Sequence, residues 1–258
     1  MTWCPPGRTG FIVNGRRFPG FLFYTNVGDI MFDRLKIIIG DKINLIKNKT
    51  VLIIGLGGVG GYALESIVRS GIERIIIVDY DIVDETNLNR QILSLNNNIG
   101  LKKVEVAYDR IKKINKDCEV IKLDMKVTLD NINILFNEKI DYVIDACDTV
   151  EVKKELIRQC LKRKIKLISC MGTGNKLDLS KLEIVDIRKT SYDPLAKIIR
   201  KMVKEENIKE KVMVVASKEQ PIKTNTKTIG STSFVPAVAG LLCASFVIND
   251  IIGDENAK

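Results

Sequence analysis

Short apolar runs alternate with amphipathic stretches between residues 51 and 170. The apolar runs, which are typical of strands buried on both faces, lie at residues 51–54, 74–78, 119–123, 142–144 and 166–170. Stretches with helical spacing separate them, at residues 60–70, 102–114 and 152–163. Because parallel strands need a crossover between them, this alternation predicts a Rossmann-like α/β fold with a doubly wound, mainly parallel sheet.

The pattern changes after residue 175. It predicts, in chain order, a strand, a basic helix, a short strand and a polar loop, at residues 182–187, 194–204, 212–215 and 217–230. The apolar stretch 234–248 has 15 residues, fewer than the roughly 20 that span a bilayer. We therefore expect a buried helix or a dimer face there, and no stable membrane insertion.

Two domain-level segments follow from these patterns. We predict a nucleotide-binding core at residues 31–175 and, at residues 176–258, a C-terminal extension that completes the fold and supplies substrate and dimer contacts. Residues 1–30 are rich in Gly, Pro, Arg and aromatic residues, unlike the Lys, Ile, Asn and Val that dominate after Met31. We interpret them as an extraneous leader, and a genuine arm that packs on a partner subunit is the alternative.

The first helical pattern of the core lies at residues 32–46. Its apolar residues Leu35, Ile38, Ile39 and Ile46 have the spacing of one helix face, and Gly40 interrupts it.

Charge favours a polyanionic partner such as RNA. The chain carries a formal charge of +9, of which the leader contributes three arginines and one aspartate, so residues 31–258 retain +9 − 2 = +7. Residues 197–204 and 218–227 are especially rich in lysine. A solvated Lys-rich surface is the alternative interpretation.

The absence of histidine excludes Ser-His and Cys-His nucleophile pairs and His-ligated metals. The six cysteines form no Cys-x-x-Cys pair, which argues against a disulfide framework and a structural zinc site and favours a cytoplasmic location. Cys147, Cys160 and Cys170 lie on or beside apolar elements, so we predict that they pack in the core.

A glycine-rich turn joins the strand at 51–54 to the helix at 60–70. It contains Gly55, Gly57, Gly58, Gly60 and Gly61. Glycine lets the backbone approach a phosphate, and the helix N-terminus offers free N–H groups. Asp79 ends the next strand about twenty residues further on, where a carboxylate can bind ribose hydroxyls. These features fit NAD and ATP equally well.

The segment 79–91 distinguishes the two nucleotides. It places several carboxylates, Asn87 and Arg90 directly after the ribose-binding position, and a dinucleotide site does not need them. A triphosphate does, because Arg pairs with phosphate oxygens and carboxylates can hold Mg²⁺. The cluster therefore favours ATP, with an ordinary polar loop as the alternative.

Several motifs together resemble the adenylation domain of the ubiquitin-activating-type superfamily: Gly55-x-Gly57-Gly58-x-Gly60, Asp79-x-Asp81, Asn87-x-x-Arg90-Gln91, Lys103 and Cys147-Asp148. The resemblance implies that the glycine turn, Asp79 and Asp81 bind the nucleotide, with Asp79 on the ribose. It also implies that Asn87, Arg90 and Lys103 contact phosphates and that Asp148 supports Mg²⁺. Arg34 resembles the arginine that reaches the ATP of the neighbouring subunit. Solvated helix charges are the alternative for Arg34 and Lys103.

Within that superfamily, residues 32–252 resemble the tRNA threonylcarbamoyladenosine dehydratase group. The supporting segments are 171–174, 186–190, 193–196 and 230–236. The resemblance implies a homodimer that uses ATP and Mg²⁺ to adenylate the carboxylate of N6-threonylcarbamoyladenosine in tRNA and then cyclise it, with a sulfur-relay protein as a further partner. Residues 1–30 match nothing in the group's pattern.

Three other functions are considered. An adenylyltransferase for a ubiquitin-like sulfur-carrier protein is weakened by the lack of Cys-x-x-Cys pairs, which many such relatives carry. A catalytically idle nucleotide-binding scaffold would be favoured by loss of Arg90 or Asp148, and both are present. A dehydrogenase leaves Asn87, Arg90 and Lys103 unexplained.

Overall fold

The computed structural model describes residues 10–13, 16–19 and 30–253. Within them, seven strands form one sheet in the order β5-β4-β3-β6-β7-β9-β8. Their bounds are β3 Thr50–Ile54, β4 Arg74–Val78, β5 Glu119–Leu123, β6 Tyr142–Asp145, β7 Lys166–Cys170, β8 Leu182–Asp186 and β9 Met213–Ser217. Neighbouring strands are parallel except β8 and β9. The predicted α/β fold with a mainly parallel sheet is confirmed.

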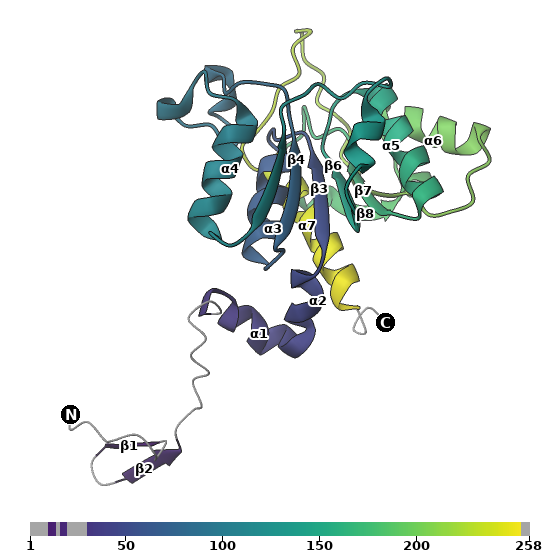
Figure 1. The fold of residues 1–258 in the computed structure, drawn as a ribbon. Coiled ribbons are helices and arrows are strands. Elements are labelled where there is room, and N and C mark those ends of the chain that lie inside the picture. Colours follow the sequence, from purple (N-terminus) through teal and green to yellow (C-terminus); the bar gives the residue numbers. More distant parts are fainter. Residues whose placement is uncertain (1–9, 14–15, 20–29, 254–258) are drawn as a thin grey trace.

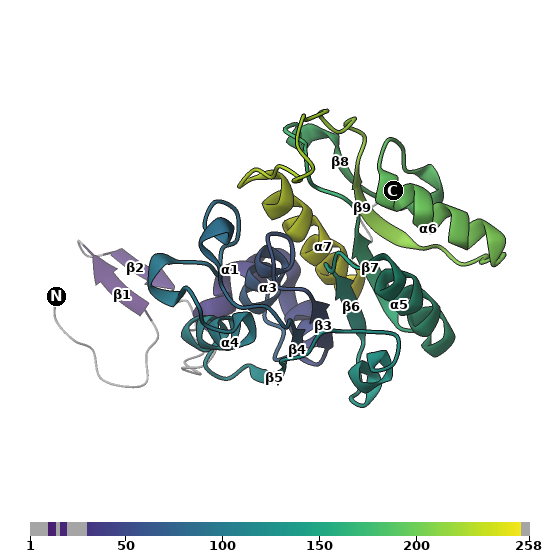
Figure 2. The ribbon, with the colours of Figure 1, turned by 90° about the horizontal axis from the view of Figure 1, so that it is seen from above.

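Helices cover both faces of this sheet (Figures 1 and 2). On one face lie α3 (Gly60–Arg69), α4 (Lys103–Ile114) and α7 (Val235–Ile252), and on the other lie α5 (Val150–Arg163) and α6 (Pro194–Glu205). Short 3₁₀ helices occupy the connections: η1 Ile30–Phe32, η2 Gly40–Lys42, η3 Glu85–Asn87, η4 Asn96–Asn98, η5 Ile132–Phe136, η6 Leu179–Lys181 and η7 Ile187–Lys189.

The central strand β3 shows why the buried strands are apolar at every position. Val51 and Ile53 pack into the core formed with α3 and α7, whereas Leu52 and Ile54 pack into the core formed with α5. Side chains alternate between the two faces of a strand, and both faces here are covered. A continuous apolar run is the consequence.

Helix α7 is the predicted buried helix. Its 18 residues are long and apolar enough, by length and composition alone, to cross a membrane. In this fold it packs against α3 and the sheet, with Ala239, Cys243 and Val247 fully buried. Gly240 permits this close packing, because a Cβ there would lie 2.2 Å from the Val59 carbonyl oxygen. Leu241 is 44% exposed, so one side of the helix also faces outward.

The helical pattern at residues 32–46 forms two helices, α1 (Asp33–Ile39) and α2 (Ile43–Lys47), separated at Gly40, whose φ is +58°. Leu35 and Ile39 pack against the core, but Ile38, which shares their predicted face, is 81% exposed. The break at Gly40 limits the part of α1 that reaches the core.

The leader is described only in part. Strands β1 (Gly10–Val13) and β2 (Arg16–Pro19) form an antiparallel pair separate from the main sheet. Residues 1–9, 14–15 and 20–29 lie outside the described residues, so the interpretation of residues 1–30 as extraneous stays a prediction.

The C-terminal segment continues the main sheet, since β8 and β9 extend it beyond β7. The division into residues 31–175 and 176–258 also stays a prediction.

The sheet has a topological switch point at β3. From β3 the chain first adds β4 and β5 on one side, and it then adds β6 and β7 on the other side. In open α/β sheets, ligands bind beyond the carboxyl ends of the strands at such a switch point.

Candidate active site

A cavity of about 540 Å³ lies at the carboxyl ends of the central strands. Four connections line it, each following one strand: residues 55–59 after β3, 79–82 after β4, 125–127 after β5 and 146–149 after β6. Thr173, Ser231 and Pro236 close its remaining side. The fold thus brings together segments that are distant in the sequence.

The glycine turn packs tightly against the loop after β6. Gly55 has a φ of +85°, and a Cβ there would lie 2.8 Å from the Ala146 carbonyl oxygen. A Cβ on Gly60 would lie 1.7 Å from the Gly55 carbonyl oxygen, so both glycines are required by the backbone itself. Gly57 and Gly58, in contrast, line the cavity, and their missing side chains leave it room for a ligand.

Asp79 is held in place at the end of β4. Its Oδ2 accepts a 2.6 Å hydrogen bond from the backbone N–H of Leu56, and its Oδ1 accepts a 2.8 Å bond from that of Asp81. The residue is 8% exposed and lines the cavity. A carboxylate fixed by two backbone donors keeps lone pairs for a ligand's hydroxyl groups.

Lys103 and Asp81 form an ion pair on the cavity wall. The ammonium Nζ lies 2.9 Å from Asp81 Oδ2, and the backbone N–H of Lys103 donates to the Asp81 carbonyl oxygen. The Lys103 side chain is only 5% exposed and begins α4. A buried cation at this position can interact with a phosphate group that enters the cavity.

The 3₁₀ helix η3 positions the amide and guanidinium groups. Asp84 Oδ1 accepts from the backbone N–H of Thr86, and Asn87 Oδ1 accepts from the backbone N–H of Asp84, a capping box. The hydrogen bonds from Thr86 hold the pKa of Asp84 below its usual value. Arg90 Nη1 donates to the Thr86 carbonyl and to Asn89 Oδ1, which orients the guanidinium beside the cavity.

Asp148 follows β6 and is exposed at the cavity wall. Its Oδ1 accepts a 3.4 Å bond from the Thr149 hydroxyl. The negative charges of several carboxylates reach Tyr80: its pKa is raised chiefly by Asp81, then by partial burial, and also by Asp148 and Asp79. The carboxylates therefore surround one part of the cavity.

Among the described residues, no group of three or more Cys, Asp or Glu side chains is arranged to hold a metal ion. Mg²⁺ commonly takes one or two carboxylates and completes its shell with water and substrate phosphates. The exposed Asp148 carboxylate fits a metal ion that arrives with the nucleotide.

A buried ion pair supports the loop after β6 from below. Lys153 Nζ lies 3.0 Å from Asp145 Oδ2, and both side chains are 0% exposed. The Ser169 hydroxyl donates to the same carboxylate oxygen, at 2.6 Å, and the backbone N–H of Cys147 donates to Asp145 Oδ1. The network fixes the start of the loop that carries Asp148.

Two features of the cavity have no counterpart among the predicted site residues. The first is a wall with apolar side chains, Ile54, Val78, Met125, Val127 and Val152, which suits a planar base. The second is Gln91, whose Oε1 is buried without a hydrogen-bond partner in the described part of the chain. In the sequence, only its place in the Asn87-x-x-Arg90-Gln91 motif marks Gln91 as a candidate site residue. The loop 125–127 has no sequence pattern that would mark it.

The cysteines are packed rather than activated. Cys160 and Cys170 are buried, as predicted. Cys147 is half-buried on the cavity wall, and burial raises the pKa of its thiol well above the usual value. A thiol held neutral in this way is a poor nucleophile.

Most of the predicted site residues lie on this cavity: Gly55, Gly57, Gly58, Asp79, Asp81, Asn87, Arg90, Lys103 and Asp148. Two do not. Gly60 lies beneath the turn at the start of α3. Arg34 is exposed on α1 and is absent from the lining. Their predicted roles, like those of the other site residues, stay predictions.

The geometry resembles that of an ATP-binding enzyme, and the comparisons with known proteins agree. The ThiF family model matches residues 33–258. The chain belongs to the ThiF family. The tRNA threonylcarbamoyladenosine dehydratase of Bacillus subtilis (strain 168) is 42% identical to this ThiF-family protein over 88% of this chain and 96% of the relative. The enzyme of the same name from Escherichia coli (strain K12) is 40% identical over 64% of this chain and 62% of the relative.

Solved structures agree with these sequence matches. The E. coli tRNA N6-threonylcarbamoyladenosine dehydratase in complex with ATP has a TM-score of 0.83 and 33% identity, covering 88% of this chain and 96% of that chain. The same enzyme in complex with AMP matches equally well. The resemblance drawn from the sequence motifs is confirmed.

Proposed function

We propose that this ThiF-family protein catalyses the ATP-dependent dehydration of N6-threonylcarbamoyladenosine in tRNA. The proposal rests on one observation. A single cavity is lined by the glycine turn, by the Asp79 carboxylate that two backbone N–H groups fix, and by the cationic side chains of Arg90 and Lys103. The relatives that match over most of this chain bear the dehydratase name. Because these relatives are dehydratases, the alternative function of a sulfur-carrier adenylyltransferase is not favoured.

Adenylation is the first step. A carboxylate oxygen of the threonylcarbamoyl group attacks the α-phosphorus of ATP, the bond to the β-phosphate oxygen breaks, and pyrophosphate leaves. The ribose hydroxyls bind Asp79, and the base lies on the apolar wall near Met125 and Val127. Arg90 and Lys103 stabilise the negative charge that develops on the phosphate oxygens.

Cyclisation is the second step. The carbamoyl group attacks the activated carboxyl carbon, the carbon–oxygen bond to AMP breaks, and the carbamoyl nitrogen loses a proton. The oxygen removed from the substrate leaves on AMP, so the substrate loses the elements of one water molecule. No covalent enzyme intermediate is needed, in keeping with the neutral Cys147 thiol.

We propose Mg²⁺ as the metal cofactor, held by Asp148. Bound there, the ion would supply charge neutralisation for the polyphosphate. Asp148 is exposed and its Thr149 contact is long, at 3.4 Å, so its oxygens keep free lone pairs. Asp148→Asn should weaken the Mg²⁺ dependence of ATP binding, and an unchanged dependence would exclude this ligand.

The function is tested by incubating the enzyme and ATP with tRNA that carries threonylcarbamoyladenosine, followed by mass spectrometry of the nucleosides. Loss of one water from that nucleoside, with AMP formed in equal amount, is expected. Arg90→Ala should abolish AMP formation and leave folding intact. Arg69→Ala is the matched control, because Arg69 is exposed on α3, pairs with Glu65 and is not on the cavity. AMP formation by Arg90→Ala at the wild-type rate would refute the assignment.

We also propose a homodimer in which Arg34 completes the partner's site. Ile37 and Ile38, next to Arg34 on α1, are 83% and 81% exposed, and α7 exposes Leu241. Exposed apolar side chains such as these favour burial against a second copy. Arg34 does not line the cavity of its own subunit, which suits a role across the interface.

Mixing two inactive variants tests this arrangement. Random pairing of Arg34→Ala with Arg90→Ala subunits gives heterodimers with one intact site, so about a quarter of wild-type activity should return. Arg90→Ala mixed with Lys103→Ala is the control, because both damage the cavity of their own subunit and nothing should return. No recovery in the first mixture would exclude action across the interface.

A cytoplasmic location is proposed as well, since the five cysteines of the described residues are free thiols. A sulfur-relay protein as partner rests on the family resemblance alone.

A further inference from the structure

A second cavity, of about 1000 Å³, lies along α6 on the flank of the molecule formed by α5 and α6. Six of its ten lining residues are basic and none is acidic: Arg188, Lys197, Arg200, Lys201, Lys204 and Lys209. None of them lines the nucleotide cavity. We refer to this feature as the α6 groove.

Internal hydrogen bonds hold the two arginines of the α6 groove. Arg188 donates to the Ile208 and Glu210 carbonyl oxygens and pairs with Asp186 at 2.9 Å. Arg200 donates to the carbonyl oxygen and the hydroxyl of Thr190. These contacts hold the two arginines in place on the walls of the groove.

The lysines of the groove are available to a ligand. Lys197, Lys204 and Lys209 are exposed, and no hydrogen bond or ion pair of their ammonium groups occurs within residues 30–253. Lys201 has only a 3.6 Å contact with Glu205, and both side chains are largely exposed. Such an exposed pair contributes little and is easily exchanged for another anion.

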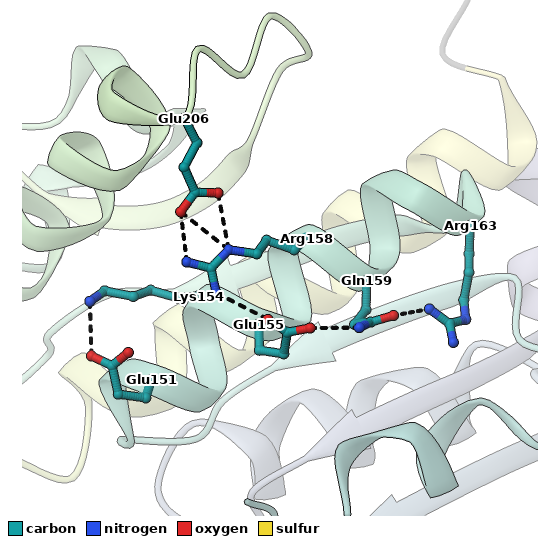
Figure 3. Close-up of polar contacts among 7 residues, drawn as sticks. All are labelled: Glu151, Lys154, Glu155, Arg158, Gln159, Arg163 and Glu206. Atoms are coloured by element: carbon teal, nitrogen blue, oxygen red, sulfur yellow. Dashed lines mark hydrogen bonds and ion pairs between the residues drawn. The ribbon is translucent and has the colours of Figure 1, made fainter. Parts of the chain in front are cut away.

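Glu206, the acidic residue that directly follows α6, faces α5 instead. Glu206 accepts three hydrogen bonds from Arg158, at 2.6 to 3.2 Å, and Figure 3 shows this pair within a row of polar contacts along α5. The bonds from Arg158 lower the pKa of Glu206 and keep it ionised. Its charge is therefore directed to Arg158 on α5, outside the residues that line the groove.

We propose that the α6 groove binds the sugar-phosphate backbone of the substrate tRNA, at a distance from the nucleotide that enters the active site. This inference rests on the proposed function for the identity of the RNA. Lys197 and Lys204 are seven residues apart on α6, or about 10 Å along the helix axis. Basic side chains spread over this length can contact successive phosphates of one chain. Partly exposed Ile198 offers an apolar contact for sugar or base between the charges.

A membrane surface fits this helix less well. Membrane-bound amphipathic helices insert a free apolar face below a basic one. In α6 the apolar face is already used, because Ala196, Ile199 and Met202 are buried against the rest of the protein. The exposed side is basic, as expected for contacts with RNA phosphates.

The test compares two double variants that each remove two charges. Lys197→Gln/Lys204→Gln changes the groove. Lys113→Gln/Lys116→Gln is the control, because both of its lysines are exposed at the end of α4, on the other flank of the sheet. Binding of the threonylcarbamoyladenosine-containing tRNA, without ATP, is measured over a range of KCl concentrations. The groove variant should bind roughly tenfold more weakly at 50 mM salt, with a salt slope reduced by about 1.5, because two phosphate contacts are lost.

With ATP present, the groove variant should raise KM for tRNA and leave kcat at saturating tRNA near the wild-type value. ATP affinity and the far-ultraviolet circular dichroism spectrum should match the control, which excludes misfolding. Equal tRNA affinity and equal salt slope in the groove and control variants would overturn the proposal and point to an acidic protein as the occupant. If the wild type formed no AMP with this tRNA, the proposed function would be wrong. The comparison of tRNA binding without ATP would still show whether the α6 groove binds RNA.

Discussion

The buried pair beneath the active site gives the most quantitative prediction. Lys153→Met removes the ammonium group that lies 3.0 Å from Asp145 Oδ2, in surroundings where both side chains are fully buried. The Asp145 carboxylate keeps hydrogen bonds from the Ser169 hydroxyl and the Cys147 backbone. It loses its only full positive charge among the described residues. Neutral donors do not replace a counter-ion in a buried site.

Breaking a buried pair by removing one partner typically costs about 3–5 kcal/mol, because an uncompensated charge stays buried. We expect Lys153→Met to lower the free energy of unfolding by that amount. For a chain of this size the melting temperature should fall by roughly 10 °C or more. The loop carrying Asp148 starts at Asp145, so ATP affinity should fall as well.

Urea unfolding of a double-mutant cycle measures this effect. Asp145→Asn/Lys153→Met replaces both charges. The amide oxygen can still accept from the Cys147 backbone N–H, and the amide NH₂ can donate to the Ser169 hydroxyl in place of the bond that hydroxyl now donates. The double variant should therefore be more stable than Lys153→Met alone. Two results would refute the reasoning: a loss below about 1 kcal/mol for Lys153→Met, the size of an ordinary hydrogen bond, or a double variant no more stable than the single one.

Three further predictions concern other parts of the site and surface. Gly60→Ala should cost about 3 kcal/mol or more in urea unfolding, since its Cβ would meet a backbone oxygen, whereas Gly57→Ala should fold normally and weaken ATP binding in calorimetry. Cys147→Ser should retain AMP formation from pH 7 to 9, because burial raises the thiol pKa. The bonds from Arg158 lower the folded-state pKa of Glu206, so their stabilisation is complete above pH 4.5 and is lost as the pH falls through the lowered pKa; the stability difference between wild type and Glu206→Gln should therefore shrink progressively in acid.

The fold was predictable where burial imposes a pattern. β4, β5 and β7 have the predicted bounds. β5 was expected to be buried on both faces, but it lies at the edge of the sheet and is only partly buried. Ends were less certain: α5 begins at Val150, two residues before its prediction, because the first turn of a helix has no apolar periodicity to mark it. Ile38 could not be assigned as exposed, since that depends on the path of the chain after Gly40.

The candidate site was predictable where a residue type carries the chemistry. Asp79, Arg90 and Lys103 stand out in the sequence as charges next to apolar elements, and all three line the cavity. The part of the cavity wall at residues 125–127 was not predictable, because these residues reach the cavity through their place after β5 in the sheet order. The role of Gln91 as a buried, unpartnered acceptor also needs three-dimensional packing to be seen.

The polar groups of the cavity differ in how firmly the protein holds them before ATP arrives. Asp79 is fixed by two backbone N–H groups, and Asn87 by a capping box. Groups held in this way need no reorganisation when a ligand binds, which favours tight and specific recognition of the ribose side. Lys103 is paired with Asp81, so a phosphate must share or replace that partner. In the proposed reaction, the nucleoside would therefore meet preorganised groups, and a phosphate would displace Asp81 from Lys103. An exchangeable contact of this kind suits an enzyme that must release pyrophosphate and AMP in every cycle.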